Sequence, residues 1–306
     1  MENLIKREKM KNLYPYFSQN PLDRLDQVRY DYDDFLELIK AKGSLFLLFD
    51  ASDILVDEKN KKTFFTYENI EEYNLNKEDI VLLGRFENVN YFTISVQNKQ
   101  IKELNKISLR EFVNFDYINE DKLGILAQAC SVLNWHNSHK FCSSCGKQTI
   151  IKRAGWKRDC PSCKKEHFPR VDSVVIMLVT FGDYCLIGQG VNFKENRYSC
   201  LAGYVESGET LEDAAKRELF EEAGIIGYEV EYMFSQPWPF PSTLMVGMRM
   251  KVNSQELKLD KKEIADAIWV HKNDMRKVLN GSCEYDFSIP SKIAIARNLL
   301  EVWVNE

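Results

Sequence analysis

The second half of the chain alternates short apolar runs with helical periods. Val174–Val179 is an unbroken apolar run, Gly182–Asp183 is a turn pair, and a second apolar run follows at Cys185–Ile187. Short apolar runs bounded by turn residues are typical of buried strands. An amphipathic period predicts a terminal helix from Ser291 to Val302. The pattern predicts a mixed α/β domain over residues 171–306.

The first half also contains strand-like and helical segments. Apolar runs at Ser44–Phe49 and Ile80–Leu83 predict strands, and a helix is expected from Asp121 to Trp135. We find no pattern of catalytic type in this half and no internal repeat in the sequence. It is therefore expected to form a separate N-terminal domain, over residues 1–137, with a role in dimerisation or in covering a substrate.

One predicted helix carries carboxylates on its apolar side. A period of 3.6 residues aligns five apolar positions on one stripe: Leu211, Ala214, Ala215, Leu219 and Ala223. Glu218, Glu221 and Glu222 fall inside this stripe or at its edge. A glycine turn at Gly203 and a capping pair of Thr210 with Asp213 precede the helix, and Gly224 suits its C-terminal cap.

These carboxylates indicate a metal. Anions directed at a protein interior repel one another and lose hydration unless a cation lies among them. A divalent ion that prefers oxygen ligands, Mg²⁺ or Mn²⁺, is the simplest candidate. The alternative is an acidic surface helix, but such a helix would carry its glutamates on the far face.

Composition limits the class of protein. With 306 residues, 44% hydrophobic and 28% charged, the chain is typical of a globular protein with two or three domains. The net charge of −5 argues against nucleic-acid binding by the surface as a whole, although not by a local basic patch. No secretory signal or long apolar span is evident. We therefore expect a cytoplasmic protein that does not associate with membranes.

Four cysteines predict a zinc ribbon over residues 138–170. Cys142 and Cys145 form one CxxC pair, and Cys160 and Cys163 form a second. Two such pairs suit one tetrahedral Zn²⁺ per chain, and four protein ligands make that zinc structural. Disulfides or a redox pair are less suited to two matched pairs in a reducing compartment. The other cysteines and the nearby histidines are expected to be structural: Cys130, Cys185, Cys200, Cys283, His136 and His139.

The ribbon segment is basic, which supports a second hypothesis. Its cations are Lys140, Lys147, Lys152, Arg153, Lys157, Arg158, Lys164, Lys165 and Arg170. They could bind RNA or DNA, or they could form a solvated face on a small metal-stapled unit, and we favour the second interpretation. A basic face would also suit nucleotide phosphates or an RNA tail.

A proline-rich segment follows the helix. Ser235–Thr243 contains Pro237, Pro239 and Pro241, which exclude a helix or a central strand. We predict a rigid loop that presents three side chains to a flat base or a ribose: Gln236, Trp238 and Phe240. A stiff connector is the alternative.

Two resemblances carry further expectations. Gly203, Glu209, Arg217-Glu218-Leu219, Glu221-Glu222 and Gly224-Ile225 together resemble the Nudix box at every defined position. Ser235–Ser242 after that box, with a four-cysteine ribbon before it, resembles the NADH pyrophosphatase (NudC-like) subfamily, and Asn20–Arg24 resembles its short N-terminal motif. The resemblance implies an α/β/α Nudix sandwich, a zinc ribbon and a degenerate Nudix-like N-terminal domain.

The resemblance also implies residue roles. Metal ligands would be the backbone carbonyl of Ala202 and the carboxylates of Glu218, Glu221, Glu222 and Glu263. Either Glu221 or Glu222 would take the proton of the attacking water. Glu209 would pair with Arg217 and brace the loop that begins at Gly203, and Gly224 would be structural. Substrate contacts would be Phe168 from the partner subunit of a homodimer, Tyr204, Gln236, Pro237, Trp238, Pro239, Phe240, Pro241, Ser242, Thr243 and Ala296.

The implied reaction is metal-dependent hydrolysis of NADH or NAD⁺ to nicotinamide mononucleotide and AMP, and some members remove NAD caps from RNA. Other Nudix substrates, such as ADP-ribose, stay open, as does a zinc-ribbon nucleic-acid-binding protein with an idle Nudix domain. Two positions depart from the subfamily pattern. Thr243 replaces a serine but keeps the hydroxyl, and Asp266 stands where relatives more often carry glutamate.

Overall fold

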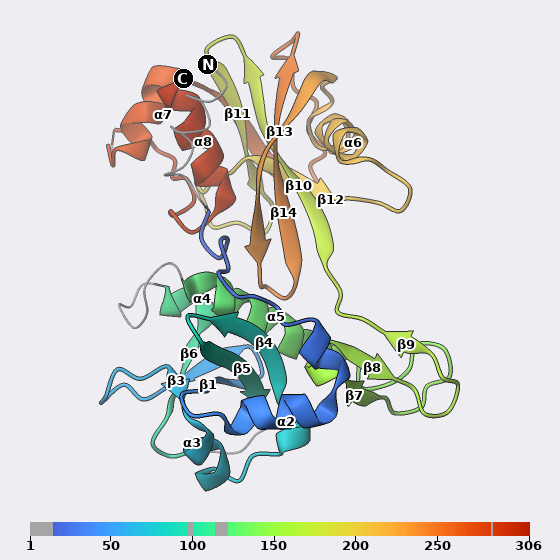
Figure 1. Ribbon diagram of the computed structural model, residues 1–306. Coiled ribbons are helices and arrows are strands. Elements are labelled where there is room, and N and C mark those ends of the chain that lie inside the picture. The colour runs from blue at the N-terminus through green and yellow to red at the C-terminus, as the bar shows by residue number, and fades with distance from the viewer. Residues whose placement is uncertain (1–14, 97–100, 114–121, 283) are drawn as a thin grey trace, which may run out of the picture. The chain divides into compact units, whose positions relative to one another are not determined.

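The computed structural model describes residues 15–96, 101–113, 122–282 and 284–306. The chain forms two compact units (Figure 1). The C-terminal unit contains Asp172–Pro237 and Thr243–Glu306 together with the described residues up to Ser18. The N-terminal unit contains Gln19–Val171 and the short segment Trp238–Ser242. The zinc-ribbon segment thus groups with the N-terminal residues.

The C-terminal unit is a mixed sheet between helices. Its elements are β10 (Asp172–Phe181), β11 (Tyr184–Gly190), β12 (Leu201–Tyr204), α6 (Leu211–Ala223), β13 (Gly227–Trp238), β14 (Thr243–Val252), β15 (Ile264–His271), α7 (Lys272–Leu279) and α8 (Ile295–Asn305). The strand order is β13-β14-β10-β11-β15, with β12 also paired to β10. Strands β10 and β14 are parallel, whereas β11 and β12 run antiparallel to β10.

Alternation along β10 builds a core on each face of this sheet. Val175 and Met177 join the core beneath α6, while Ile176 and Leu178 join the core beneath α7 and α8. Side chains of a strand alternate between faces, so an unbroken apolar run is what a strand covered on both sides requires. The α/β/α sandwich is therefore confirmed.

The N-terminal unit holds a second mixed sheet. Its elements are η1 (Gln27–Tyr30), α2 (Tyr32–Lys40), β1 (Leu45–Asp50), β2 (Asp53–Val56), β3 (Phe64–Phe65), α3 (Tyr67–Glu72), η2 (Lys77–Asp79), β4 (Val81–Phe86), β5 (Val89–Ser95), β6 (Asn105–Ser108), α4 (Leu109–Phe112) and α5 (Leu123–Ser138). Phe46 and Phe92 stack in its core with ring centroids 4.9 Å apart. The Asn20–Arg24 motif packs inside this unit, since Asn20 Nδ2 donates to Gly124 O and Gln128 Oε1.

The two large sheets share one topology, although the sequence shows no repeat. The N-terminal order is β4-β5-β1-β2-β6 with β3 also on β1, which matches β13-β14-β10-β11-β15 with β12 on β10, strand for strand. The parallel pair also recurs, as β1 with β5 and as β10 with β14. Helix α3 occupies the connection that α6 occupies in the C-terminal unit, but it is far shorter. The N-terminal unit is thus a reduced copy of the C-terminal fold.

The ribbon forms a small sheet of its own. Its elements are β7 (Ile150–Lys152), η4 (Arg153–Gly155), β8 (Lys157–Asp159) and β9 (Glu166–His167), in the order β7-β8-β9. Figure 1 shows these strands beside the end of α5 within the N-terminal unit.

The expected elements are found, with shifted bounds. The predicted strands correspond to β10, β11, β1 and β4, and the three predicted helices correspond to α5, α6 and α8. Asp121 lies outside the described residues. Two local expectations are wrong. Pro237 lies in β13, which tolerates it because β13 is an edge strand, and Gly203 lies in strand β12, not in a turn.

Candidate active site

Helix α6 holds two of its glutamates inside the protein. Thr210 accepts a hydrogen bond from Asp213 N at the start of the helix, and Gly224 ends it in the left-handed conformation with φ 72°. Glu218 and Glu222 are only 9% and 6% exposed, on the side that packs into the core. Glu221, by contrast, is exposed. The helical period thus separates two buried carboxylates from one at the surface.

Gly203 is required by the Glu218 carboxylate. In strand β12, Gly203 pairs with Val175 of β10. A Cβ atom at this position would lie 1.8 Å from Glu218 Cδ, so a larger residue would force the carboxylate to move. The Ala202 backbone, one residue earlier in the same strand, is paired to Ile176. The glycine allows the backbone of β12 and the carboxylate to meet, which is a more direct reason for Gly203 than a turn.

Arg217 organises the acidic end of this site. Its Nε and Nη2 atoms donate to Glu209 Oε1 and Oε2 at 2.5 and 3.0 Å, and Nη2 also donates to Tyr204 O at 2.9 Å. Nη1 donates to Glu218 Oε1 at 2.9 Å and to Glu221 Oε2 at 2.8 Å. These hydrogen bonds lower the pKa of Glu209 to about 2. One guanidinium therefore joins the loop before the helix to two of the candidate ligands.

Glu222 is left without a partner. Its Oε2 atom is buried and has no hydrogen-bond partner. Burial, and then the negative charges of Glu218, Glu263 and Glu221, raise the Glu222 pKa to about 8. Burial also raises the pKa of Glu218. A cation would stabilise a buried carboxylate surrounded by other carboxylates, and the donor set suits a hard divalent ion.

The loop before β15 brings Glu263 to this cluster. Asp260 N donates to Glu222 O at 3.0 Å, and Lys258 N donates to Ala223 O at 2.8 Å. These bonds satisfy carbonyls at the end of α6 and fix the loop there. Glu263 N in turn donates to Asp260 O at 3.1 Å. Sequence patterns alone do not show this connection, because it depends on backbone groups and not on side chains.

The proline-rich segment is divided between the two units. Gln236 is fully buried, with Nε2 donating to Tyr16 O at 2.9 Å and to Ile293 O at 2.8 Å, and Oε1 accepting from Ile295 N at 2.9 Å. The expectation that this segment presents Gln236 is therefore wrong. Its amide is fully used in holding the start of α8, where Ala294 provides no side-chain cap.

The tip of the segment packs within the N-terminal unit. The Trp238 and Phe240 rings meet edge to face at 5.1 Å, and the Arg110 guanidinium lies over both, at 5.3 and 4.2 Å from their centroids. Cys130 Sγ donates to Pro239 O at 3.5 Å. The Phe240–Pro241 peptide bond is cis. Trp238 and Phe240 remain partly exposed, whereas Thr243, at the start of β14, is buried.

The other expected substrate contacts differ in exposure. Tyr204 and Phe168 are 63% and 53% exposed, as aromatic side chains available for stacking would be. Ala296 is only 1% exposed and belongs to the core beneath α8. Its side chain presents no surface to a ligand.

The four ribbon cysteines form a zinc site. Their Sγ atoms all lie within 4.8 Å of one another, the only such metal-ligand group among the described residues. The Cys142–Cys163 and Cys145–Cys160 sulfur distances are 3.6 and 3.5 Å, close to the ~3.8 Å separation of a tetrahedral Zn–thiolate site. Backbone N–H groups of Ser144 and Cys163 lower the pKa of Cys142 to about 7 and of Cys160 to about 6. The site fits structural zinc.

The remaining cysteines and both histidines agree with structural roles. Cys130, Cys185 and Cys200 are buried, and Cys283 lies outside the described residues. His136 is buried, with Nε2 bonded to Gly155 O at 2.8 Å and Nδ1 to Arg158 Nη1 at 2.9 Å. His139 is bonded to Trp135 O through Nδ1.

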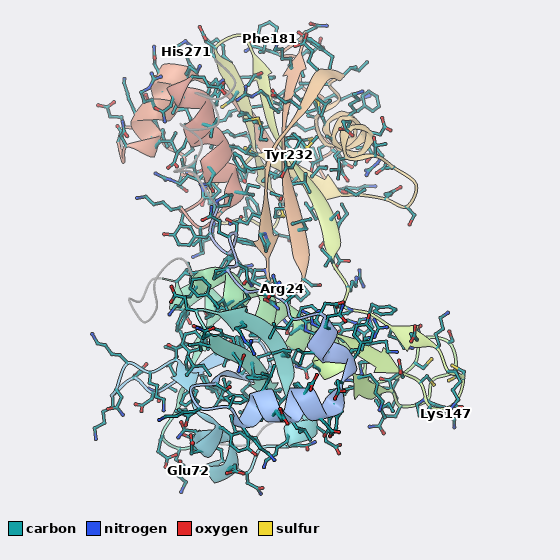
Figure 2. All side chains as sticks on the ribbon, viewed as in Figure 1. Arg24, Glu72, Lys147, Phe181, Tyr232 and His271 are labelled. Carbon is teal, nitrogen blue, oxygen red and sulfur yellow. The ribbon has the colours of Figure 1, made fainter. Side chains whose placement is uncertain are left out.

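The ribbon cations do not form one continuous basic face. Lys157 and Arg158 are buried, and Lys157 forms salt bridges with Asp159 and Glu166. Lys147, in contrast, is exposed at the outer end of the ribbon (Figure 2). The interpretation as a solvated charged face therefore applies to exposed ribbon cations such as Lys147, whereas the buried Lys157 and Arg158 stabilise the ribbon itself.

Sequence reasoning missed the partner of Asp266. Tyr198 is buried, and its hydroxyl donates to Asp266 Oδ2 at 2.6 Å. Burial, followed by this carboxylate, raises the pKa of Tyr198 to about 12. The hydrogen bond from Tyr198 to Asp266 therefore fixes the start of β15, the strand that begins directly after Glu263.

Family models and relatives agree with this geometry. Residues 169–285 match the NUDIX domain, residues 137–168 match the NADH pyrophosphatase zinc ribbon domain, and residues 43–135 match the NADH pyrophosphatase-like rudimentary NUDIX domain. The human protein named NAD-capped RNA hydrolase NUDT12 is 34% identical over 94% of this chain and 73% of its own length. The NAD-capped RNA hydrolase NudC of Stutzerimonas stutzeri is 34% identical over 64% of this chain and 66% of its own length. Across the described residues, no helix has the length and apolar character needed to cross a membrane.

Proposed function

Because the chain belongs to the Nudix hydrolase family, in the branch with an NADH pyrophosphatase zinc ribbon, we propose that it hydrolyses the diphosphate of NADH, NAD⁺ and NAD-capped RNA. Free dinucleotide gives nicotinamide mononucleotide and AMP, and capped RNA gives nicotinamide mononucleotide and an RNA with a 5′ phosphate. The observation that carries this proposal is the buried carboxyl group of Glu222, whose Oε2 atom has no hydrogen-bond partner, among three other glutamates.

The proposed metal ligands are the carboxylates of Glu218, Glu222 and Glu263, helped by Glu221, and the carbonyl of Ala202. When Mg²⁺ or Mn²⁺ is bound there, it neutralises phosphate charge and lowers the pKa of the attacking water. Glu221 or Glu222 accepts the proton of that water, and the bond between one phosphorus and the bridging oxygen breaks. Carboxylates coupled this closely share the titration, so the base is assigned to the pair.

Arg217 keeps this arrangement in place. It fixes Glu218 and Glu221 while holding Glu209 and the backbone of Tyr204. Its charge also offsets part of the carboxylate repulsion. Arg217 is thus proposed as a positioning residue.

For the substrate, we propose that the exposed rings of Tyr204 and Phe168 enclose the adenine, with Phe168 contributed by the partner subunit of a homodimer. The proposed segment Pro237–Thr243 contacts the substrate through Trp238 and Phe240. The domain boundaries stay at 1–137, 138–170 and 171–306 in this proposal. A cytoplasmic setting suits four thiolates that must stay reduced.

Product analysis tests the proposed function. Purified zinc-loaded protein is incubated with Mg²⁺ or Mn²⁺ and, in parallel, with NADH, ADP-ribose and a short NAD-capped RNA at equal concentration. We expect nicotinamide mononucleotide from NADH and from the capped RNA, and no product after chelation. Faster cleavage of ADP-ribose would assign a different Nudix substrate. No cleavage of any substrate would favour a nucleic-acid-binding protein with an idle Nudix domain.

A further inference from the structure

The N-terminal unit contains a cavity whose lining includes no residue of the carboxylate cluster. Its volume is 610 Å³, which falls in the range of about 300–1,000 Å³ typical of ligand pockets. It is lined by η1, the start of α2, η2, β7 and η4, all within that unit. No residue of the proposed metal site or of the zinc site lines it.

Its lining contains four cationic and three acidic residues, a slight excess of positive charge. Arg29, Lys152, Arg153 and Arg158 line the cavity. Arg158 is already engaged, since Nε and Nη2 donate to Thr149 Oγ1 and O and Nη1 bonds to His136 Nδ1, which leaves Arg29, Lys152 and Arg153 as the available cations. The acidic lining residues are Asp31, Glu78 and Asp79. Asp31 Oδ1 accepts from Asp33 N and Asp34 N at the start of α2, so part of this carboxylate is directed at the helix N-terminus. The lining therefore suits an anionic ligand.

Arg29 has an unused donor here. Its Nε atom donates to Arg24 O at 3.0 Å, and its guanidinium lies 4.4 Å from the centroid of the Trp156 ring. These contacts hold the side chain in one orientation. The Nη2 atom is nevertheless buried and has no hydrogen-bond partner. A buried donor without an acceptor is unfavourable, and a phosphate oxygen would satisfy it.

Aromatic side chains accompany the cations. Tyr30 and Tyr32 line the cavity and are 60% and 61% exposed. The Arg153 guanidinium lies 4.3 Å from the Tyr30 ring centroid. Arg153, Ala154 and Gly155 have φ values of 51°, 48° and 96°, an unusual run of left-handed backbone conformations. A hydrogen bond between His136 Nε2 and Gly155 O holds the end of this run in place.

An adjoining cavity extends the site. It has a volume of 250 Å³ and shares Asp79, Gln148, Ile151 and Arg158 with the first. It also reaches Lys140, a further ribbon cation. Adjoining cavities with Arg29, Lys152 and Arg153 in the first and Lys140 in the second suit a chain of nucleotides better than one compact anion, since successive phosphates need successive contacts.

We propose that this cavity binds a nucleotide unit of single-stranded RNA, with a base stacked on Tyr30 or Tyr32 and a phosphate held by Arg29 and Arg153. Exposed aromatic rings beside arginines are the combination that binds single-stranded nucleic acid without strong sequence preference. The inference rests on the proposed function only in choosing RNA as the nucleic acid. A free nucleotide offers the same chemistry, so the test must separate the two sources.

Binding of uncapped RNA tests the inference. The probe is a fluorescent single-stranded RNA of about ten nucleotides with a 5′ hydroxyl, since ssRNA sites span about 4–16 nucleotides. The full, zinc-loaded chain is used without Mg²⁺ or Mn²⁺, and anisotropy is measured. The variants are Tyr30→Ala and Arg153→Asn, because asparagine tolerates the left-handed backbone of position 153. The matched control is Lys164→Asn, which removes the same charge at φ 64° in the ribbon, outside both cavities.

We expect Tyr30→Ala to weaken RNA binding by about 5- to 150-fold, as base–aromatic stacking typically contributes, and Arg153→Asn to weaken it more than the control variant does. Lys164→Asn should weaken it by less than about threefold, as one exposed charge does. AMP should displace the RNA only at far higher concentration than unlabelled RNA. Absent wild-type binding, equal weakening by Lys164→Asn, or equally effective displacement by AMP would each overturn the proposal. NADH turnover by the wild-type protein is measured separately as a test of the proposed function. A failure of the RNA-binding proposal can therefore be distinguished from a failure of the proposed hydrolase activity.

Discussion

At the residue scale, exposure separates glutamates that adjoin in sequence. Glu222 is buried and unpartnered, whereas Glu221, one position earlier, is exposed and bonded to Arg217. The helical period alone produces this difference, because neighbouring positions are about 100° apart around a helix. The structure therefore makes Glu222 the carboxylate that depends most on a cation.

Glu222→Gln should abolish most of the activity without harming the fold. The amide keeps the shape of the side chain but neither binds a divalent ion strongly nor accepts a proton, so kcat should fall by about 10²–10⁴. The melting temperature of the metal-free variant should stay close to that of the wild type at pH 7, because a carboxyl whose pKa is raised to about 8 is already largely neutral there. Glu212→Gln, at an exposed position of the same helix, is the control and should change neither. Near-normal turnover by Glu222→Gln would exclude Glu222 from the metal site.

Gly203→Ala should mimic the loss of Glu218. The new methyl group would occupy the place of the Glu218 carboxylate, 1.8 Å from Cδ, and must displace it. Metal-dependent turnover, measured as kcat/KM on NADH, should therefore drop as far as in Glu218→Ala. Gly190→Ala is the control, since its Cβ would meet only ordinary contacts at 3.5 Å or more. Full activity of Gly203→Ala would show that the carboxylate can move without loss.

At the element scale, the sequence predicted helix α6, its caps and the main strands because each depends on local periodicity and turn chemistry. Thr210 and Gly224 predicted the two ends of α6, and the apolar run Val174–Val179 predicted β10. The burial of Gln236 was not, because it depends on Tyr16 and Ile293, which are distant in sequence. Three prolines nearby indicated a rigid loop, whereas the edge position of β13 allowed the strand to continue through Pro237.

Gln236→Leu distinguishes a structural clamp from a substrate contact. Leucine cannot replace three hydrogen bonds, so the backbone groups of Tyr16, Ile293 and Ile295 lose the Gln236 amide, and the loss at the buried Ile295 N–H alone costs about 1–3 kcal/mol. The free energy of unfolding, measured by denaturant titration, should fall accordingly. A raised KM for NADH with unchanged stability would instead restore Gln236 to the substrate site.

At the scale of the whole molecule, one fold occurs twice with different chemistry. Helix α3 also carries three glutamates, Glu68, Glu71 and Glu72, but all are exposed, and Glu71 pairs with Lys77. A short helix cannot bury them against a sheet, so no charge is left in need of a cation. The sequence could not reveal this repeat, because topology is retained by pairing and packing while the residues differ.

Shared active sites would make the protein a functional dimer. If Phe168 of the partner subunit serves each site, mixing Phe168→Ala protein with Glu222→Gln protein should restore activity in mixed dimers. Phe168→Ala alone should weaken dinucleotide binding, by about 1–3 kcal/mol for a lost base–aromatic stack. Turnover of NADH at low concentration is measured after the two variants have exchanged subunits. A mixture no more active than the sum of its parts would place Phe168 in its own chain's site or in none.

Zinc removal should affect the two units unequally, because the ribbon packs within the N-terminal unit only. Cys160→Ser removes one of four thiolates, and metal binding contributes folding free energy to such small sites directly. Wild-type protein should contain about one tightly held zinc per chain, and in the variant the thermal transition of the N-terminal unit should fall while that of the C-terminal unit persists. Cys185→Ser, at a buried cysteine of the C-terminal unit, is the control. It should lower the thermal transition of the C-terminal unit and leave that of the N-terminal unit unchanged. Calorimetry with limited proteolysis separates the transitions. A fully folded, zinc-free wild-type protein would contradict the structural role of the metal.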